Sequence, residues 1–274
     1  MNSTELIGWL GLSAYLVAGL LLAIGRYRDL HPALIAGACA AAIGVAAHAY
    51  SLYGMMVLAD GVDLNFFNTL SLSALLVAAV ILMVATRTRV IEVGVVAFPG
   101  AALCLALVLL VSPEPLLMAR HSVMVRVHVI GSLLAYSLLS IAALHAMYLA
   151  IQERLLHRPT RLNYLDLLPP LTVMERMLFQ LVFAGWLLLT VSVATGLLFV
   201  SDLMAQHLAH KTILSILSWL IFGLLLLGRW RFGWRSRLAI RLTLAAMALL
   251  LLGYFGSKLV LEVLLGRQWQ GALP

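Results

Sequence analysis

Histidine is the residue type through which this chain could do chemistry. Eight histidines occur in 274 residues, against two cysteines, Cys39 and Cys104, which lie far apart in apolar stretches. This cysteine spacing excludes a C-x-x-C redox motif, a zinc site built of cysteines and covalent c-type haem attachment to the chain. A neutral imidazole nitrogen, by contrast, is a common ligand for metal ions and for haem iron. The sequence holds no nucleophile constellation, Gly-rich phosphate loop or metalloprotease motif, so we expect no enzymatic chemistry of its own.

Three of the histidines, His48, His128 and His210, are candidate ligands. His48 falls inside a long apolar segment, where an ionisable group is costly and is therefore suspected of a function. His128 opens a stripe of polar side chains at a spacing of four residues that includes Ser132 and Tyr136. This spacing places the stripe on one helix face, directed towards other protein. Such a stripe indicates either helix packing, which is the commoner case, or a polar ligand cavity.

The elements that must position these residues are membrane-spanning helices. The chain is 64% hydrophobic and 11% charged, with a mean hydropathy of +1.06, which excludes a soluble globular domain. Its net charge of +7 might suggest a nucleic-acid partner in a soluble protein. In a membrane protein basic residues mark the cytoplasmic loops instead, so we expect no nucleic-acid partner.

Apolar runs interrupted by charge or proline predict eight helices, because a span takes about 20 apolar residues. The predicted ranges are 4–25, 33–54, 67–86, 93–112, 127–151, 177–200, 211–228 and 241–263. The fold class expected is therefore all-α: a polytopic integral membrane protein with eight transmembrane helices. We expect residues 1–274 to form a single transmembrane domain.

Basic residues are distributed unevenly between the two sides that these helices define. The side holding the first, third, fifth and seventh loops carries thirteen arginines, and the other side carries five arginines and lysines. The positive-inside rule therefore predicts that both termini are periplasmic, in a bacterial cytoplasmic (inner) membrane. His48, His128 and His210 then lie on the outer side. The basic inner connections, 152–175 and GRWRFGWRSR at 228–237, are predicted to lie at the membrane surface against lipid.

No Asp, Glu, Lys or Arg falls in the middle of a predicted span. Lys258 and Glu262 lie near the end of the last helix, four residues apart, and are predicted to pair. An ion-coupled transporter or proton pump needs an ionisable group at mid-depth, so this class of function is disfavoured. An uncoupled pathway for a small neutral solute ranks last among the alternatives.

Several segments resemble, in order, the cytochrome c assembly membrane protein family, the haem-handling proteins of c-type cytochrome biogenesis. They are RVHVIGSLLAYSLLSIAALHAMYLA, LPPLTVMERMLF, VATGLLF, HKTILSILSWLIF, GWRSR and YFGSK. Together they lie between about residues 120 and 260, and the family-like region extends over about 35–265. The resemblance implies that haem is held at the periplasmic face between two histidines and a tryptophan-rich loop, for cytochrome biogenesis.

His128 matches the first outer-face haem-ligand histidine of the family. On this resemblance we expect a haem cofactor in a cavity between helices two, five, six and seven, with His48 or His210 opposite His128. Tyr136 and Ser132 would then hydrogen-bond the propionates or orient the ring.

Arg126, together with Arg120, is expected to neutralise propionate charge at the same face.

The chain departs from the family pattern near the inner end of the seventh helix, where Leu227 stands in place of a histidine, and at two places on the outer face. The stretch LMAQHLAHKT stands where the tryptophan-rich motif is expected, and the C-terminal LGRQWQGALP lacks the second outer-face histidine. These departures favour the alternative, a ligand-free membrane scaffold or accessory subunit that uses its basic cytoplasmic loops. The expected partners are membrane lipids and, for either function, other cytochrome-biogenesis or membrane proteins.

Overall fold

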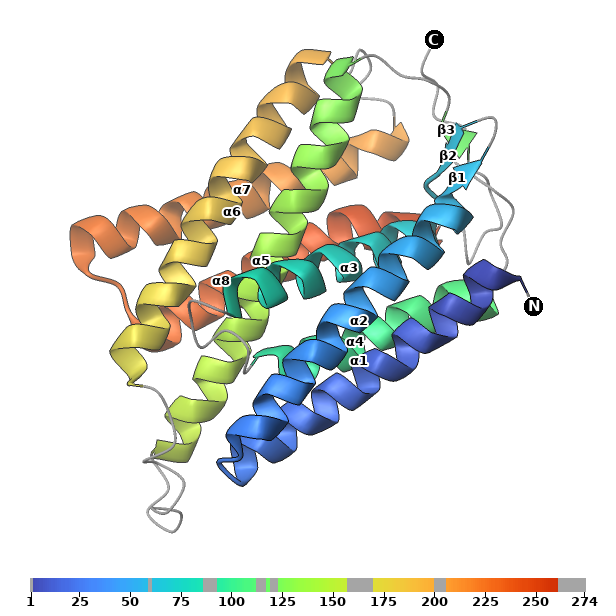
Figure 1. The fold of residues 1–274 in the computed structure, drawn as a ribbon. Helices are drawn as coiled ribbons and strands as arrows, with labels where there is room; N and C mark the ends of the chain where they lie inside the picture. The colour runs from blue at the N-terminus through green and yellow to red at the C-terminus, as the bar shows by residue number, and fades with distance from the viewer. Residues whose placement is uncertain are drawn as a thin grey trace. The chain divides into compact units, whose positions relative to one another are not determined.

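Eight α-helices make up most of the described part of the chain, as the sequence predicts (Figure 1). The computed structural model describes residues 2–58, 61–85, 93–111, 117–118, 123–156, 170–199 and 206–260. The helices are α1 (Ser3–Tyr27), α2 (His31–Met56), α3 (Phe66–Ala85), α4 (Gly94–Leu110), α5 (Val123–Leu156), α6 (Leu171–Phe199), α7 (Gln206–Phe232) and α8 (Ser236–Leu251). Seven of the described helices are long and apolar enough to cross a membrane, and α4 is an apolar helix of 17 residues. The all-α, polytopic membrane fold is thus confirmed.

Helices α6 and α7 are longer than the apolar runs from which the sequence predicts them. α6 begins at Leu171, directly after Pro170, and α7 continues through the Arg- and Trp-rich segment to Phe232. The connection to α8 is therefore only three residues long and turns at Gly233, whose φ is +66°. Arginine and tryptophan are compatible with helical backbone, so a helix continues where the hydrophobic pattern stops. The interfacial segment predicted before α6 falls mainly on 157–169, outside the described residues.

The chain divides into two compact units, which we call the N-terminal bundle (residues 1–122 and 255–274) and the C-terminal bundle (residues 123–254). In the N-terminal bundle α1 packs on α2 and α4, and α3 packs on α4 and α2. α1 and α2 lie antiparallel, side by side (Figure 1). A Cβ added at Gly44 would lie 2.7 Å from a ring carbon of Tyr15, so a glycine is needed for this close approach.

A small antiparallel sheet, which the sequence analysis does not predict, caps the N-terminal bundle. Its strands are β1 (Val57–Leu58), β2 (Gly61–Asp63) and β3 (Leu117–Met118), in the order β1-β2-β3. Val62 lies between the other strands, opposite Val57 on one side and Met118 on the other. The sheet thus ties the connection after α2 to the segment that precedes α5.

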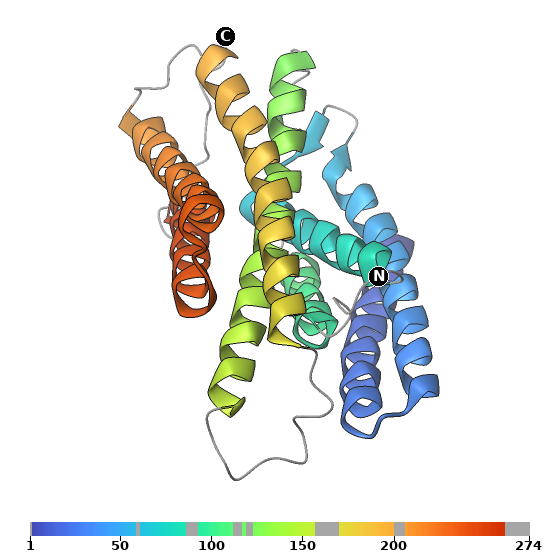
Figure 2. The ribbon, with the colours of Figure 1, turned by 90° about the vertical axis from the view of Figure 1, so that its left-hand side faces the viewer.

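In the C-terminal bundle α5 packs on α6 and α8, and α7 packs on α8 and α6. Figures 1 and 2 show α5 and α6 running antiparallel along each other. The indole rings of Trp186 on α6 and Trp219 on α7 stack with centroids 5.8 Å apart. The Trp186 indole donates to the Trp219 carbonyl (3.1 Å), and the Trp219 indole donates to the Thr190 hydroxyl (2.8 Å). These bonds satisfy the indole N–H groups within an apolar contact between two helices.

A π-helical turn, η3 (Leu252–Gly256), follows α8. Tyr254 in this turn packs on Tyr136 of the C-terminal bundle, with ring centroids 5.5 Å apart. The next residue, Phe255, packs on Phe66 of the N-terminal bundle, with ring centroids 6.2 Å apart. The boundary between the two units therefore falls inside the turn.

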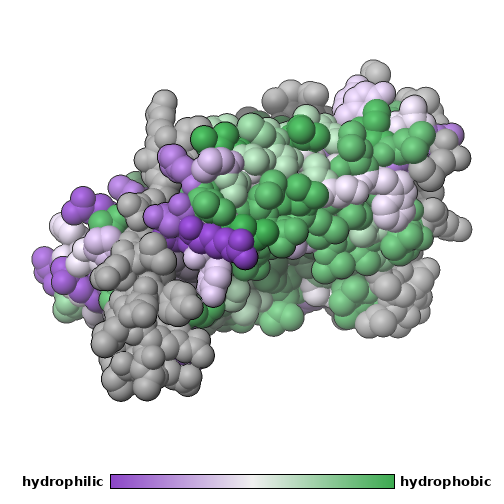
Figure 3. Space-filling view, turned by 60° about the horizontal axis from the view of Figure 1, so that its bottom comes forward, coloured by the Kyte–Doolittle hydropathy of each residue, from purple (hydrophilic) through white to green (hydrophobic). Residues whose placement is uncertain are grey.

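Large apolar side chains lie on the outer surface of the helices, as lipid-facing residues do. Leu198 is 75% exposed and Leu20 is 60% exposed, with many similar residues on the other helices. On the face drawn in Figure 3, apolar side chains cover a broad area and hydrophilic side chains gather at one end. This distribution fits helices that cross a bilayer and end at its charged interface.

Candidate functional site

His128 lies one turn into α5, against the last turns of α6. Its ring nitrogen Nδ1 is 2.9 Å from the backbone carbonyl of Ser192 and 3.3 Å from the Thr195 hydroxyl. The side chain is half-buried. The sequence places it there because α5 and α6 pair along their length, so the first turns of one helix meet the last turns of the other.

The contact with Ser192 fixes the protonation of the imidazole. A carbonyl oxygen only accepts hydrogen bonds, so Nδ1 must be the donor. In the neutral ring Nε2 then carries the lone pair. His128 Nε2 has no hydrogen-bond partner among the described residues. An imidazole anchored through one nitrogen to a carbonyl, with the other nitrogen uncommitted, is the arrangement typical of a metal-ligating histidine.

Gly196 leaves space for the His128 ring. A Cβ added at Gly196 would lie 3.0 Å from His128 Cε1 and 3.4 Å from Nδ1. The separation from Cε1 is tighter than ordinary van der Waals contact, so a side chain at this position would push the imidazole. Gly196 belongs to the segment VATGLLF that carries part of the family resemblance, but the sequence analysis assigns it no role.

Ser132 and Tyr136 follow His128 on the same face of α5, as their spacing predicts, and their hydroxyls bind protein groups. Ser132 Oγ donates to the His128 carbonyl (2.7 Å) and lies 2.5 Å from Ser192 Oγ on α6. The Tyr136 hydroxyl donates to the Leu250 carbonyl on α8 at 2.8 Å. The stripe therefore joins α5 to α6 at Ser132 and to α8 at Tyr136.

His48, the second candidate ligand, lies in the core of the N-terminal bundle. Its side chain is 0% exposed. Nδ1 shares a hydrogen bond with the Tyr15 hydroxyl (3.3 Å), and Nε2 shares one with the Ser71 hydroxyl (2.8 Å). In this arrangement both ring nitrogens are occupied, and the histidine joins α2 to α1 and α3.

His210 is exposed in the first turns of α7, and within the described part of the chain it makes no hydrogen bond with His128. Arg126 lies in the first turn of α5, and its side chain is outside the described residues, as is the whole of Arg120. The described residues contain no group of three or more His, Cys, Asp or Glu side chains able to hold a metal ion. The site residues are thus distributed over two units: His48 in the N-terminal bundle, and His128 and His210 in the C-terminal bundle.

Comparison with known proteins gives the family. The family model for cytochrome C assembly proteins matches residues 36–265. The chain belongs to the cytochrome c assembly protein family. It is 32% identical over 255 residues to the inner membrane protein YpjD of Escherichia coli (strain K12). The aligned residues cover 92% of this chain and 94% of the relative. The chain is 41% identical over 143 residues to the uncharacterized 28.8 kDa protein in nifR3-like 5′ region of Azospirillum brasilense, covering 51% and 52% of the two chains.

No solved structure matches the chain. The match to YpjD also confirms that the chain resembles the YpjD-type inner membrane proteins of this family. Together with the seven long apolar helices, it confirms the prediction of a multi-pass inner membrane protein of the cytochrome c assembly family.

A polar cluster that the sequence analysis missed lies at the start of α3 in this family member. Lys258 is 4% exposed, and its ammonium donates to the Leu64 carbonyl and to the Thr69 hydroxyl (3.3 Å). The nearby Asp63 carboxylate accepts from the side-chain amides of Asn65 (2.9 Å) and Asn68 (3.1 Å). The sequence analysis pairs Lys258 with Glu262, which lies outside the described residues.

Buried His145 on α5 is a further polar group inside the C-terminal bundle. Its Nε2 donates to the Met174 carbonyl on α6 at 3.0 Å, and its buried Nδ1 has no partner among the described residues. The bond resembles that of His128, but the His145 side chain is 0% exposed. A ligand as large as haem therefore has no access to this imidazole in the folded bundle.

Proposed function

We propose that this cytochrome c assembly family protein binds haem at the periplasmic face of the membrane during cytochrome biogenesis, with His128 as an axial ligand. The observation that carries the proposal is the anchored, half-buried imidazole of His128, whose Nε2 makes no hydrogen bond with a described residue. When bound, haem supplies a redox-active iron whose axial positions accept imidazole nitrogens. The donor set around His128 fits one such bond.

His210 is the better candidate for a second residue that would hold the haem, because its imidazole is exposed and makes no hydrogen bond with described residues. His48 would first have to give up a hydrogen bond to Tyr15 or Ser71. The predicted cavity draws α2 from one bundle and α5, α6 and α7 from the other, and it stays a prediction. Neutralisation of the haem propionates by Arg126 also stays a prediction.

Ser132 and Tyr136 act as positioning residues in this proposal. Their hydroxyl protons are donated to the carbonyls of His128 and Leu250. They hold the first turns of α5 against α6 and α8, and so set the direction of the His128 ring. The protein's task is then to hold a cofactor in place and not to transform a substrate.

Haem titration tests the proposal. The protein, purified in mild detergent, is titrated with haem and its Soret absorbance is recorded, together with that of His128→Ala and of the matched control His31→Ala. His31 is exposed at the start of α2, distant in sequence from the site. We expect saturable haem binding in the wild type and the control, about 100-fold weaker binding in His128→Ala, and partial recovery of the band when free imidazole is added to that variant.

The absence of a haem band in the wild type, or equal bands in the wild type and His128→Ala, would contradict the proposal.

A ligand-free membrane scaffold is the second candidate. It is favoured by the basic and aromatic end of α7, where Trp230 is 79% exposed beside Arg231 and Phe232. Aromatic and arginine side chains are enriched where proteins bind one another. Crosslinking from a photoreactive residue at position 230 in intact membranes would give a defined protein adduct under this alternative, whereas lipid adducts alone would contradict it.

The orientation proposed for the chain has both termini in the periplasm. In the C-terminal bundle the end of α5, the start of α6, the end of α7 and the start of α8 all carry arginine, including Arg154, Arg176, Arg229 and Arg241. A basic end of this kind lies in the cytoplasm. A reporter that works only in the cytoplasm should be active when it is inserted at Gly233. Activity of a reporter that works only in the periplasm, inserted at the same residue, would reverse the orientation.

A further inference from the structure

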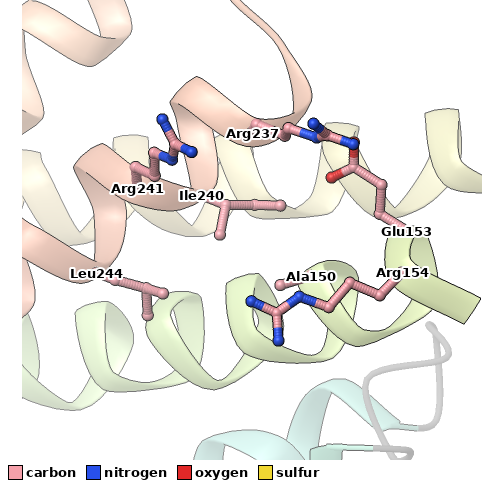
Figure 4. A pocket seen from close by; sticks show the side chains of 7 residues that line it. All are labelled: Ala150, Glu153, Arg154, Arg237, Ile240, Arg241 and Leu244. Carbon is pink, nitrogen blue, oxygen red and sulfur yellow. The ribbon is translucent and has the colours of Figure 1, made fainter.

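A groove of about 580 Å³ lies between the end of α5 and the start of α8 in the C-terminal bundle (Figure 4). Its apolar lining is formed by Ala150, Ile240 and Leu244, and its charged lining by Glu153, Arg154, Arg237 and Arg241. The groove thus combines an apolar surface with a charged rim. It lies at the basic end of the bundle, apart from His128.

One ion pair at the rim is satisfied within the protein. Arg237 Nε lies 3.2 Å from Glu153 Oε1, and the same carboxylate oxygen accepts from the Ser236 hydroxyl at 2.8 Å. Figure 4 shows the Glu153 carboxylate turned to Arg237 on α8. The pair joins α5 to α8, and its charges offset each other.

Arg154 and Arg241 have no such partner among the residues that the structure describes. Both side chains are exposed, and neither makes a hydrogen bond or an ion pair with a described residue. In Figure 4 the Arg154 side chain extends along α5 towards Ala150, away from the Glu153 carboxylate. With Glu153 paired to Arg237, the described part of the chain supplies no opposite charge for Arg154 and Arg241, which lie beside an apolar surface.

We propose that this groove binds an anionic phospholipid, with the lipid phosphodiester on Arg154 and Arg241 and an acyl chain along Ile240 and Leu244. A guanidinium presents a planar fork of N–H donors that binds two phosphate oxygens at once. Ile240 and Leu244 lie one helical turn apart on α8, so they form a continuous apolar strip along the direction in which that helix enters the membrane. Basic pockets between transmembrane helices bind anionic lipid headgroups in this way.

An amphiphilic lipid fits the groove better than a small soluble anion does. A free phosphate would use the two arginines and leave the apolar lining of the groove, including the partly exposed Leu244, uncovered. A zwitterionic lipid would bring its own cation next to two guanidinium groups, which costs electrostatic energy. Charge and apolar surface are complementary together only to a lipid whose headgroup carries net negative charge.

The test compares lipid binding by wild-type protein and by Arg154→Gln/Arg241→Gln. Native mass spectrometry of the detergent-solubilised protein measures binding of phosphatidylglycerol and of phosphatidylcholine. The matched control is Arg28→Gln/Arg176→Gln, which also removes two exposed arginines, both outside the groove. At about fivefold per arginine, we expect phosphatidylglycerol binding to fall roughly 25-fold in the groove variant and less than twofold in the control.

A second variant, Arg154→Lys/Arg241→Lys, keeps the charge and removes the planar fork. Its phosphatidylglycerol affinity should lie between those of the wild type and the glutamine variant, and it preserves the test if the glutamine variant fails to fold. Equal binding of the two lipids by the wild type would overturn the proposal. An equal loss of binding in the groove variant and the control would overturn it as well. Inorganic phosphate that displaces the lipid at millimolar concentration would identify a site for a free anion instead.

Discussion

His48 and His128 show how the two bundles use the same side chain differently. In the N-terminal bundle the His48 ring is fully buried and hydrogen-bonded at both nitrogens. In the C-terminal bundle the His128 ring is half-buried and anchored at one nitrogen by a carbonyl. The first arrangement holds three helices together, and the second leaves a lone pair for a ligand. The capacity of an intramembrane histidine to bind a metal therefore depends on how many of its nitrogens the fold already occupies.

Removal of the His48 side chain should have the largest effect on stability and a small effect on ligand binding. His48→Ala leaves a cavity and deprives the buried Tyr15 and Ser71 hydroxyls of their partner, which costs about 3–5 kcal/mol. Thermal unfolding in detergent measures the loss. The haem spectrum of the protein that remains folded should keep its shape, and a lost Soret band at low temperature would instead make His48 an axial ligand.

Replacement of Gly44 tests whether close helix packing supports the N-terminal bundle. In Gly44→Ala the new Cβ lies 2.7 Å from the Tyr15 ring, so α1 and α2 must separate, at a cost of about 1–3 kcal/mol. Gly100→Ala on α4 is the matched control, because nothing lies within 4 Å of its added Cβ. Equal unfolding temperatures for the two variants would show that α1 and α2 are not as close as described.

Replacement of Gly196 should change haem binding more than stability. In Gly196→Ala the Cβ presses on the His128 ring at 3.0 Å and turns Nε2 away from its direction. We expect about tenfold weaker haem binding, since small misplacement of a ligand group is costly. Gly131→Ala on α5, where an added Cβ has nothing within 4 Å, should bind haem as the wild type does. If both variants bind equally, the space at Gly196 has no part in positioning the imidazole.

Ser132→Ala should have the smallest effect of the four. It removes the contact with Ser192 Oγ and the bond to the His128 carbonyl, worth about 1 kcal/mol. Haem affinity should fall about fivefold, and a Ser132→Thr variant, which keeps the hydroxyl, should recover most of it. A change in the position of the Soret maximum of Ser132→Ala would contradict the positioning role, because it would place this hydroxyl next to the haem.

The number and order of the helices could be predicted because long apolar runs are a strong and local signal. The ends of the helices could not be predicted in this way, since α7 continues through Arg229 to Phe232, beyond the end of its apolar run. The three strands have only two or three residues each, too few to show an alternating pattern. His128 and the stripe after it could be predicted because a spacing of four fixes one helix face.

The partners of the candidate residues could not be predicted, because they come from distant parts of the chain. Ser71 is 23 residues from His48, and Ser192 is 64 residues from His128. The contact between Lys258 and Thr69 spans 189 residues. Such contacts depend on how helices pair and rotate against each other, which the hydrophobic pattern does not specify.

The wide turn η3 keeps the residues after it in phase with α8. A π-helical turn holds one residue more than an α-helical turn does, and so absorbs that residue within the turn. In a regular α-helix the same extra residue would advance Lys258 by about 100° around the axis and turn its ammonium away from Leu64 and Thr69. The polar cluster at the start of α3 thus depends on an irregular turn in the helix that supplies its cation.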